Sequence, residues 1–335
     1  MAKYSIRVQF ASITTCFESE LESDIIELGS FFKYHRVDAC QETDCTVVLK
    51  RQASFRMSKD AEIQWQSKSH VNAKAGDCVD RQRISVCNNF DTFGFASCYM
   101  SRERGEYYYG LMQDKSWICC RPAEHLINYV LHKRPKRNNQ PEKNEIANPM
   151  TAMPLLIHVI STIFGRFIVH GAAVCSDNRA FLFLGKSGSG KSTLCTDLAK
   201  KNLAFMGDDL VLLYVKDGVP MVGSLLFQAK LYVDNAKEKR DVDVPEEMHA
   251  NYCLSAPLES VYLVRQSGMP MSTVEPLPSI ELLQQLIYAS NGMMMQYDRH
   301  EWLATMYSIS ELVPFFIFNF GNRSSLNASL LKTGR

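Results

Sequence analysis

The sequence predicts an α/β protein in which a smaller β-rich N-terminal domain precedes a larger α/β domain. Strand patterns fill residues 1–120, strands and helices alternate from Pro149 onward, and a polar, proline-containing stretch separates the two regions. The chain has 335 residues, which is enough for two domains of ordinary size. We therefore place the N-terminal domain at residues 1–134, a linker at 135–148 and the second domain at 149–335.

Composition and charge exclude several classes of protein. The chain is 46% hydrophobic and 22% charged, so it has enough apolar side chains for a packed core. Its formal charge of +1 gives no basic surface for nucleic acid or acidic lipid. No apolar run approaches the about 18 residues that span a bilayer, and the N-terminus lacks a signal core. The 11 cysteines are irregularly spaced and indicate reduced thiols. We expect a cytoplasmic protein with no nucleic-acid or membrane partner.

The first domain has the composition and alternation of β-strands in four segments. These are residues 4–10, 45–49, 107–109 and 116–120. Their tyrosines and tryptophans indicate packing within a sheet rather than a recognition surface. Residues 123–134 have the pattern of an amphipathic helix with basic residues in its last turn, which suits the helix dipole. No catalytic spacing occurs in residues 1–120, so this domain presents a substrate or joins subunits into a homo-oligomer.

The second domain alternates helices and strands. We expect helices at residues 155–164, 192–202 and 279–289, and strands at residues 167–175, 180–184, 203–206 and 210–215. Asp177-Asn178 and Asp217-Gly218 have the composition of tight turns. The segment 234–247 is dense in charge and contains Pro245, so we expect a surface loop. The apolar face of the last helix is expected to consist of Ile280, Leu283, Leu286 and Ile287.

The most informative segment is the glycine-rich stretch between the strand 180–184 and the helix 192–202. It fits the pattern G-x-x-x-x-G-K-[ST] in full, and its members are Gly185, Lys186, Ser187, Gly188, Ser189, Gly190, Lys191, Ser192 and Thr193. Glycines let the backbone curl so that successive N–H groups point at phosphate oxygens, and the following helix adds its positive N-terminal end. We expect Lys191 to reach the outer phosphates of ATP and the Ser192 hydroxyl to hold Mg²⁺.

Two adjacent carboxylates, Asp208 and Asp209, follow the predicted strand 203–206. A strand, a helix and a second strand form a right-handed crossover, which places the C-terminal ends of both strands at one edge of the sheet. The carboxylates are therefore expected beside the phosphate loop. Because neighbouring residues at a strand end point to different sides, one carboxylate can coordinate Mg²⁺ while the other faces an acceptor.

A histidine, His170, lies inside the otherwise apolar strand 167–175. If Asp177-Asn178 is a two-residue hairpin turn, the strands on either side pair residue by residue from the turn outward. This register predicts that His170 lies opposite Gly185, the first residue of the phosphate loop. There its imidazole can hydrogen-bond Asp208 or a phosphate.

The order of these motifs resembles the C-terminal domain of HPr kinase/phosphorylase, which belongs to the phosphoenolpyruvate-carboxykinase-like branch of P-loop proteins. The resemblance covers roughly residues 150–330 and rests on the strand histidine, the phosphate loop and the Asp-Asp pair. The spacings from His170 to Lys191 and from Lys191 to Asp208 agree with that family. The resemblance implies a mixed sheet with flanking helices, and an ATP- and Mg²⁺-dependent kinase that phosphorylates a serine-type hydroxyl of a protein or peptide.

The same resemblance implies roles for individual residues. Asp208 falls on the position of the acid/base catalyst, with His170 and Lys191 as further catalytic residues. Asp209 falls on a metal-binding position, beside the Ser192 hydroxyl. Apart from the resemblance, their spacing in the sequence alone makes Lys230 and Arg265 further candidates for a contact with the transferred phosphoryl group.

The chain also departs from the HPr enzymes. Residues 227–240 do not match the glycine-rich signature associated with phosphorolysis, and the N-terminal third does not match their usual partner domain. The chain is more similar to stand-alone HPr-kinase-like proteins, some of which phosphorylate serine in peptides. Two other functions stay open: an ATP-binding regulator or assembly factor with little catalysis, and a phosphoenolpyruvate-carboxykinase-like small-molecule enzyme.

Overall fold

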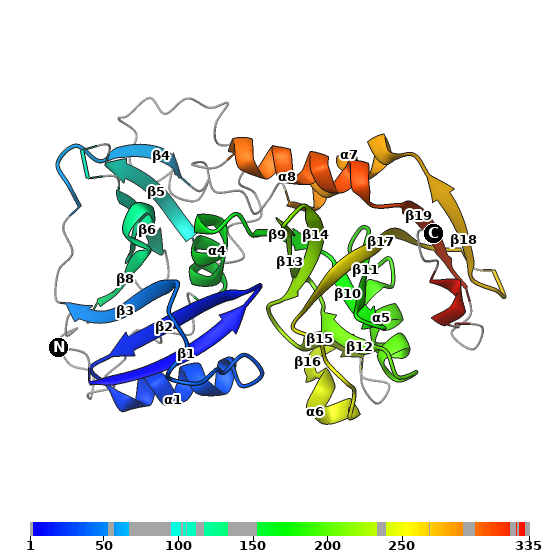
Figure 1. Ribbon diagram of the computed structural model, residues 1–335, viewed down its shortest axis with the longest axis horizontal. Helices are drawn as coiled ribbons and strands as arrows, with labels where there is room; N and C mark the ends of the chain where they lie inside the picture. Colours follow the sequence, from blue (N-terminus) through cyan, green and yellow to red (C-terminus); the bar gives the residue numbers. More distant parts are fainter. Residues whose placement is uncertain are drawn as a thin grey trace, which may run out of the picture. The chain divides into compact units, whose positions relative to one another are not determined.

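The computed structural model describes residues 3–52, 57–66, 95–101, 103–104, 106–111, 117–132, 153–232, 239–267, 269–290, 299–321, 326 and 328–331. Within these residues the fold is mixed α/β and dominated by strands, with curled sheets and a few helices (Figure 1). The chain forms two compact units, Met1–Gln9 with Ile13–Phe164, and Phe10–Ser12 with Gly165–Arg335. Helix α4 (Met153–Ile163) thus belongs to the first unit, while the sequence predicts a second domain that begins at residue 149. The predicted linker at residues 135–148 lies outside the described residues.

The first unit contains an eight-stranded sheet in the order β1-β2-β3-β8-β7-β6-β5-β4. Its elements are β1 (Tyr4–Phe10), β2 (Ile13–Ser19), α1 (Glu22–Phe31), β3 (Cys45–Gln52), β4 (Glu62–Gln66), β5 (Phe95–Ser101), β6 (Glu106–Leu111), β7 (Trp117–Arg121), the 3-10 helix η2 (Pro122–Glu124), β8 (Leu126–His132) and α4. The strands predicted in this region are confirmed as β1, β3, β6 and β7. Tyr108 of β6 is buried, as expected for packing within a sheet.

The helix predicted at residues 123–134 is wrong. Its described part, residues 123–132, contains the end of η2 and then β8, a strand that pairs with β3 on one side and β7 on the other. Ile127 and Tyr129 are fully buried on one face, and Val130 is buried on the opposite face. A strand that is covered on both faces is apolar almost throughout, so it lacks the polar alternation that separates a strand from a helix in sequence.

The second unit contains a nine-stranded sheet that follows the order β12-β10-β11-β17-β14-β13-β9, with β19 on β17 and β18 on β19. Its strands are β9 (Phe167–His170), β10 (Ala172–Ser176), β11 (Arg179–Leu184), β12 (Ala204–Gly207), β13 (Leu210–Lys216), β14 (Val219–Ser224), β17 (Ser255–Gln266), β18 (Thr273–Leu277) and β19 (Phe315–Phe320). The helices are α5 (Lys191–Ala199), α6 (Val244–Met248), α7 (Ser279–Ser290), α8 (Arg299–Leu312) and the 3-10 helix η7 (Ala328–Leu330). A separate two-stranded sheet is formed by β15 (Gln228–Tyr232) and β16 (Lys239–Asp243).

The strand predicted at residues 167–175 is divided at Gly171. The part before it, β9, pairs with β13, while the part after it, β10, pairs with β11 and β12. One stretch of chain therefore belongs to both halves of the sheet, which curls. A Cβ at Gly171 would lie 3.1 Å from side-chain carbons of both Leu182 and Leu184, so glycine permits the close approach at this crossing point.

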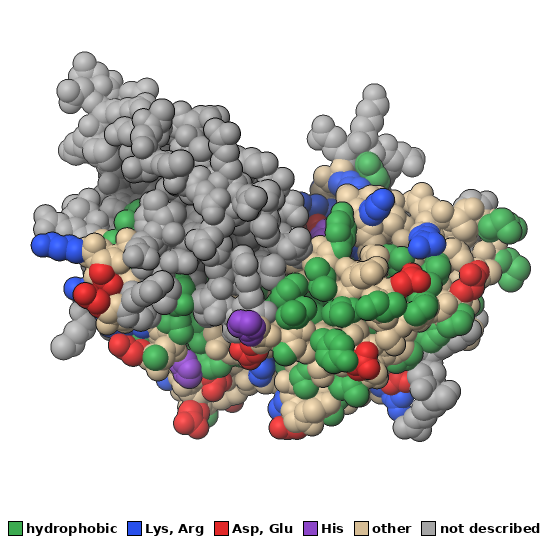
Figure 2. Space-filling model, turned by 90° about the horizontal axis from the view of Figure 1, so that it is seen from above, with side chains coloured by type: hydrophobic (Ala, Val, Ile, Leu, Met, Phe, Trp, Pro, Cys, Tyr) green, Lys and Arg blue, Asp and Glu red, His purple; other side chains and the backbone are tan. Residues whose placement is uncertain are grey.

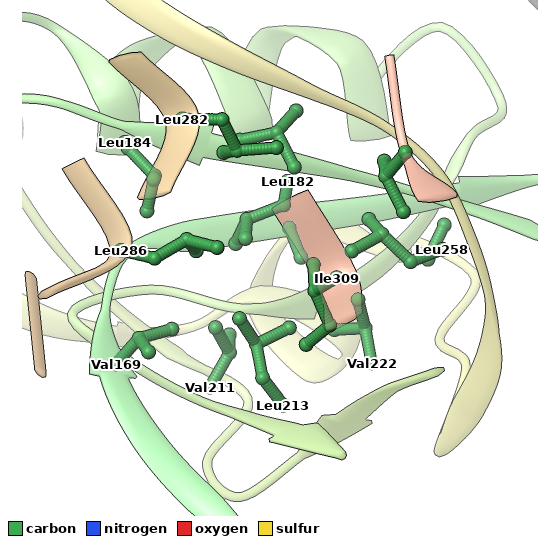
Figure 3. Close-up of a cluster of buried hydrophobic side chains, with 14 of the residues drawn as sticks. Val169, Leu182, Leu184, Val211, Leu213, Val222, Leu258, Leu282, Leu286 and Ile309 are labelled. Carbon is green, nitrogen blue, oxygen red and sulfur yellow. The ribbon is translucent and has the colours of Figure 1, made fainter. Parts of the chain in front are cut away.

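The core of the second unit lies within the curled sheet and is closed by α7 and α8 (Figure 3). The strands contribute Val169, Leu182, Leu184, Val211, Leu213, Val222 and Leu258, and the two helices contribute Leu282, Leu286 and Ile309. The helix predicted at residues 279–289 is confirmed as α7, but its apolar face is centred on Leu282 and Leu286. Ile280 was expected on that face and is 62% exposed. Figure 2 shows further hydrophobic side chains on the surface of this unit. The homo-oligomer that the sequence analysis names as one role of the first domain stays a prediction.

The remaining local predictions have mixed outcomes. Helices α4 and α5, strands β11, β12 and β13, and the two predicted turns are confirmed. The surface loop expected at residues 234–247 is wrong over its described part, which contains β16 and α6. Pro245 suits the first turn of a helix, and the Asp243 side chain caps α6 by accepting from the Glu246 N–H at 3.1 Å. No described helix is long and apolar enough to cross a membrane.

Candidate functional site

The glycine-rich loop joins β11 to α5, as its sequence predicts (Figure 1). Gly190 precedes the helix with a φ of 100°, and its carbonyl accepts the first helical bond from the Leu194 N–H at 2.8 Å. Gly185 has a φ of 144°, and a Cβ there would lie 2.9 Å from the carbonyl oxygen of Val264. Both conformations favour glycine, so these two residues set the path of the loop.

Lys191 is folded back over this loop. Its side chain is buried, and Nζ donates to the carbonyl oxygens of Gly185 at 2.9 Å and of Lys186 at 3.2 Å. Burial lowers the pKa of Lys191, and the negative charges of Asp208 and Asp209 oppose that shift. A lysine beside a curled glycine-rich backbone at a helix N-terminus has the chemistry of a phosphate site.

The other loop residues surround this position. Lys186, Ser187 and Gly188 are exposed, Ser189 is half-buried, and Thr193 lies in the first turn of α5. The Ser189 N–H donates to the Lys186 carbonyl at 3.1 Å and closes a turn. The exposed backbone of the loop is therefore accessible to a ligand.

Asp208 reaches the loop from the next strand. β12 lies on the far side of β10 from β11, and both are antiparallel to β10, so β11 and β12 are parallel and end at the same edge. Asp208, directly after β12, therefore lies at the same sheet edge as the glycine-rich loop, as the sequence predicts. The Ser192 Oγ donates to Asp208 Oδ1 at 2.9 Å, and the Lys230 N–H donates to Oδ2 at 3.4 Å.

The environment of Asp208 is strongly desolvated. The residue is 4% exposed. Burial raises the pKa of Asp208, the bond from Ser192 opposes this, and the nearby charge of Asp209 adds to the rise. A carboxylate and a serine hydroxyl within hydrogen-bond distance are oxygen ligands of the kind that Mg²⁺ takes beside phosphates. These residues therefore fit a magnesium ion.

His170 does not lie where the predicted register placed it. The hairpin register holds from Ser176 opposite Arg179 as far as Ala172 opposite Phe183, where β10 ends. His170 belongs to β9 and pairs with Leu210 of β13. The expected pairing of His170 with Gly185 is therefore wrong, because the chain changes strand partners at Gly171.

His170 instead lies beside Asp209. Its Nδ1 is 4.0 Å from Asp209 Oδ1, and the two side chains are 37% and 44% exposed. Asp209 adopts a φ of 64°, and its carbonyl accepts from the Gly171 N–H at 3.3 Å. Burial lowers the pKa of His170, the charge of Lys191 adds to this, and Asp209 opposes it. The two adjacent carboxylates thus face different surroundings, as predicted.

Gln266 is a contact that the sequence analysis missed. Its Nε2 donates to the Gly188 carbonyl at 3.2 Å. It lies at the end of β17, which runs parallel to β11, with Leu263 opposite Leu184. Parallel strands end at one edge of a sheet, so a polar residue at the end of an apolar strand, such as Gln266, could have been expected near the loop. Lys230, a predicted phosphoryl contact, meets the site through its backbone N–H.

Among known proteins, similarity to this chain is found in solved structures. No family model and no curated protein matches the chain. Among solved structures, the chain is similar to the HPr(Ser) kinase/phosphatase from Coxiella burnetii, with a TM-score of 0.29 and 13% sequence identity over 46% of this chain and 85% of that one. This similarity is weak.

Proposed function

We propose that this chain is an ATP- and Mg²⁺-dependent kinase that transfers the γ-phosphoryl group to a serine-type hydroxyl of a protein or peptide. The observation that carries the proposal is the 2.9 Å bond from Ser192 Oγ to Asp208 Oδ1, directly after the glycine-rich loop. In P-loop enzymes a loop serine and a carboxylate at a neighbouring strand end hold Mg²⁺ beside the phosphates. The same two groups meet in this chain.

The loop supplies the phosphate-binding groups. Its N–H groups and the positive end of α5 favour an anion, and Lys191 lies within reach of that anion. Mg²⁺, when bound, neutralises charge on the phosphate oxygens. Lys191 and the loop amides then stabilise the charge that spreads over the γ-phosphoryl oxygens during transfer.

The two carboxylates differ as a metal ligand and a proton acceptor would. Asp208 is 4% exposed and bonded to Ser192, which suits a metal ligand. The Asp209 side chain is 44% exposed and lies near His170, so a hydroxyl on a large acceptor can reach it. We therefore assign metal binding to Asp208 with Ser192, and proton acceptance to Asp209 with His170 as its positioning residue. The family resemblance implies the opposite order, with Asp208 as the acid/base catalyst.

In the proposed reaction, one bond to the γ-phosphorus forms as another breaks, and Asp209 accepts the proton that is released. A bond forms between the acceptor oxygen and the γ-phosphorus, while the bond from that phosphorus to the bridging oxygen of ATP breaks. The hydroxyl proton passes to the Asp209 carboxylate, and the products are ADP and a phosphate ester.

The test is incubation with γ-labelled ATP, Mg²⁺ and a panel of serine-containing peptides, read by label incorporation and by the mass shift of one phosphoryl group. Lys191→Ala should weaken nucleotide binding. Lys216→Ala should not, because Lys216 is exposed and lies at the end of β13 that is farther from Asp209. Unchanged nucleotide affinity in Lys191→Ala would overturn the proposal. Tight ATP binding with no transfer to any acceptor would favour the ATP-binding regulator instead.

A further inference from the structure

Gln266 of β17 lies against the glycine-rich loop on the side away from Asp208. Its Nε2 donates to the Gly188 carbonyl at 3.2 Å, and a Cβ at Gly190 would lie 3.9 Å from the same nitrogen. In the sheet order β12-β10-β11-β17, β12 with Asp208 lies on one side of β11 and β17 on the other. A metal ion at Asp208 bridges the outer phosphates of ATP, so we expect the nucleoside end on the Gln266 side of the loop.

The contact with the loop fixes the orientation of the Gln266 amide. A carbonyl oxygen accepts hydrogen bonds and cannot donate them, so the nitrogen end of the amide must face Gly188. Oε1 therefore points away from that carbonyl, and the residue is exposed. The amide nitrogen also carries a second hydrogen. Gln266 thus presents one acceptor and one donor, side by side, next to the phosphate loop.

This arrangement of an acceptor and a donor matches one edge of adenine. Adenine has an amino group at N6, which donates, beside N7, which accepts, and the glutamine amide can bind both at once. A purine with an oxygen in place of the amino group has two acceptors on that edge, so it would place an oxygen against Gln266 Oε1. Because the loop prevents the amide from turning over, Gln266 favours adenine.

The segment that follows β17 is held against the end of β19. Gln266 lies opposite Phe320 in the β17–β19 pairing, and Gly321 follows Phe320. The Gly321 N–H donates to Ser272 Oγ at 3.0 Å, and a Cβ at Gly321 would lie 2.6 Å from the carbonyl carbon and oxygen of Met271. The main chain at Met271 is therefore packed beside the residue that follows the partner of Gln266.

Two methionines of this segment are exposed although their main chain is packed. Met269 is 61% exposed and Met271 is 68% exposed. The Met269 N–H donates to Ser267 Oγ at 3.2 Å, and the Met269 carbonyl oxygen would lie 2.7 Å from a Cβ at Gly321. The thioether of methionine is polarisable and makes favourable contacts with aromatic rings. The two side chains therefore form an apolar surface that suits a planar base.

We propose that Gln266, Met269 and Met271 bind the adenine base of ATP. Gln266 Oε1 accepts from the N6 amino group and Nε2 donates its second hydrogen to N7, while the two methionines contact the ring. The inference rests on the proposed function for its use of a nucleotide, since it names the groups that recognise the base at the same site. It does not depend on phosphoryl transfer.

The experiment compares three probes by calorimetric titration with Mg²⁺ present. They are ATP, ITP, whose base has an oxygen in place of the amino group, and inorganic tripolyphosphate, which has no nucleoside. The wild-type chain should bind ATP about fivefold more tightly than ITP, and ITP more tightly than tripolyphosphate. Gln266→Leu should bind ATP and ITP equally. Gln284→Leu, at an exposed position in α7, is the matched control and should keep the preference for ATP.

The methionines are tested with the same three probes. Met269→Ala combined with Met271→Ala should weaken the binding of ATP and ITP to a similar extent, because their contact does not depend on the group at position 6 of the purine. The affinity for tripolyphosphate should not change in this double variant. Unchanged affinity for both nucleotides would remove the two methionines from the site.

Each remaining outcome decides the inference. Equal wild-type affinities for ATP and ITP, or an unchanged preference in Gln266→Leu, overturn it. If Gln266→Leu weakens tripolyphosphate as much as ATP, Gln266 only supports the loop and the inference also fails. A preference for ATP that Gln266→Leu removes supports the base site even where no acceptor is phosphorylated, and in that case only the kinase function fails. If none of the three probes binds the wild-type chain, both proposals fail.

Discussion

The Ser192 hydroxyl, in the first turn of α5, donates a hydrogen bond to Asp208 Oδ1 at 2.9 Å, although the rest of that helix and strand β12 separate the two residues in the chain. The bond connects the glycine-rich loop to the end of β12, which runs parallel to β11. It also gives a partner to a carboxylate that is 4% exposed, and a buried charge without a partner is costly. The position of Asp208 is therefore set by the fold itself.

Asp208→Asn and Ser192→Ala should both reduce the contribution of Mg²⁺ to nucleotide binding. Ser192→Ala removes one oxygen ligand from the assigned metal site, and Asp208→Asn removes the negative charge of the other ligand, so the affinity for Mg²⁺-ATP should fall by at least roughly tenfold. Calorimetric titrations of ATP with Mg²⁺ and with a chelator separate this effect from binding by the loop. Binding without Mg²⁺ should be nearly the same in both variants and in the wild-type chain. An unchanged Mg²⁺ dependence would remove Asp208 from the metal site.

Asp209→Asn should show the opposite behaviour. The amide cannot accept the hydroxyl proton, so the transfer rate should fall by about 10²- to 10⁴-fold while Mg²⁺-ATP binding is retained. The measurements are single-turnover transfer to a peptide acceptor and calorimetric titration of Mg²⁺-ATP. The result would contradict our assignment if Asp209→Asn transferred at the wild-type rate while Asp208→Asn bound Mg²⁺-ATP normally and did not transfer.

The elements of the site that depend on local sequence could be predicted. The glycine-rich loop, the turn at Asp177-Asn178 and the carboxylates after β12 each follow from residue types within a few positions. Their meeting at one edge follows from the handedness of a crossover connection. These rules need no knowledge of the rest of the fold.

The contact of His170 with Asp209 could not be predicted, because it depends on where the chain changes strand partners. Gly171 allows that change through its close approach to Leu182 and Leu184, and no local pattern marks such an approach. A similar limit applies to β8, whose burial on both faces removes the alternation of a strand. The β15–β16 hairpin was not predicted, because the exposed side chains of β16 are charged and its sequence resembles that of a surface loop.

Asp208→Asn should also make the protein more stable at neutral pH. Burial raises the pKa of Asp208 above its value in the unfolded chain, so the folded state holds the ionised carboxylate at a cost. This free-energy cost is present when the pH is above the pKa of Asp208 in the folded chain. It disappears as the pH falls towards the lower pKa that Asp208 has in the unfolded chain. Urea unfolding of both proteins should therefore show a stabilised variant at neutral pH and a difference that shrinks on acidification. A constant difference across the range would contradict the direction of the pKa shift.

His158 should make the first unit sensitive to acid. It lies buried in α4, and burial lowers the pKa of His158 to about 3. As the pH falls below about 6.5, the unfolded chain binds a proton at this residue while the folded chain does not, so stability falls by up to about 1.4 kcal/mol per pH unit. His158→Leu, which has no titratable group, should lose this part of the pH dependence, measured by urea unfolding between about pH 7 and about pH 5. His300→Gln, at an exposed position in α8, is the control and should keep the wild-type slope. Equal slopes in His158→Leu and the wild-type chain would show that His158 takes up its proton without unfolding.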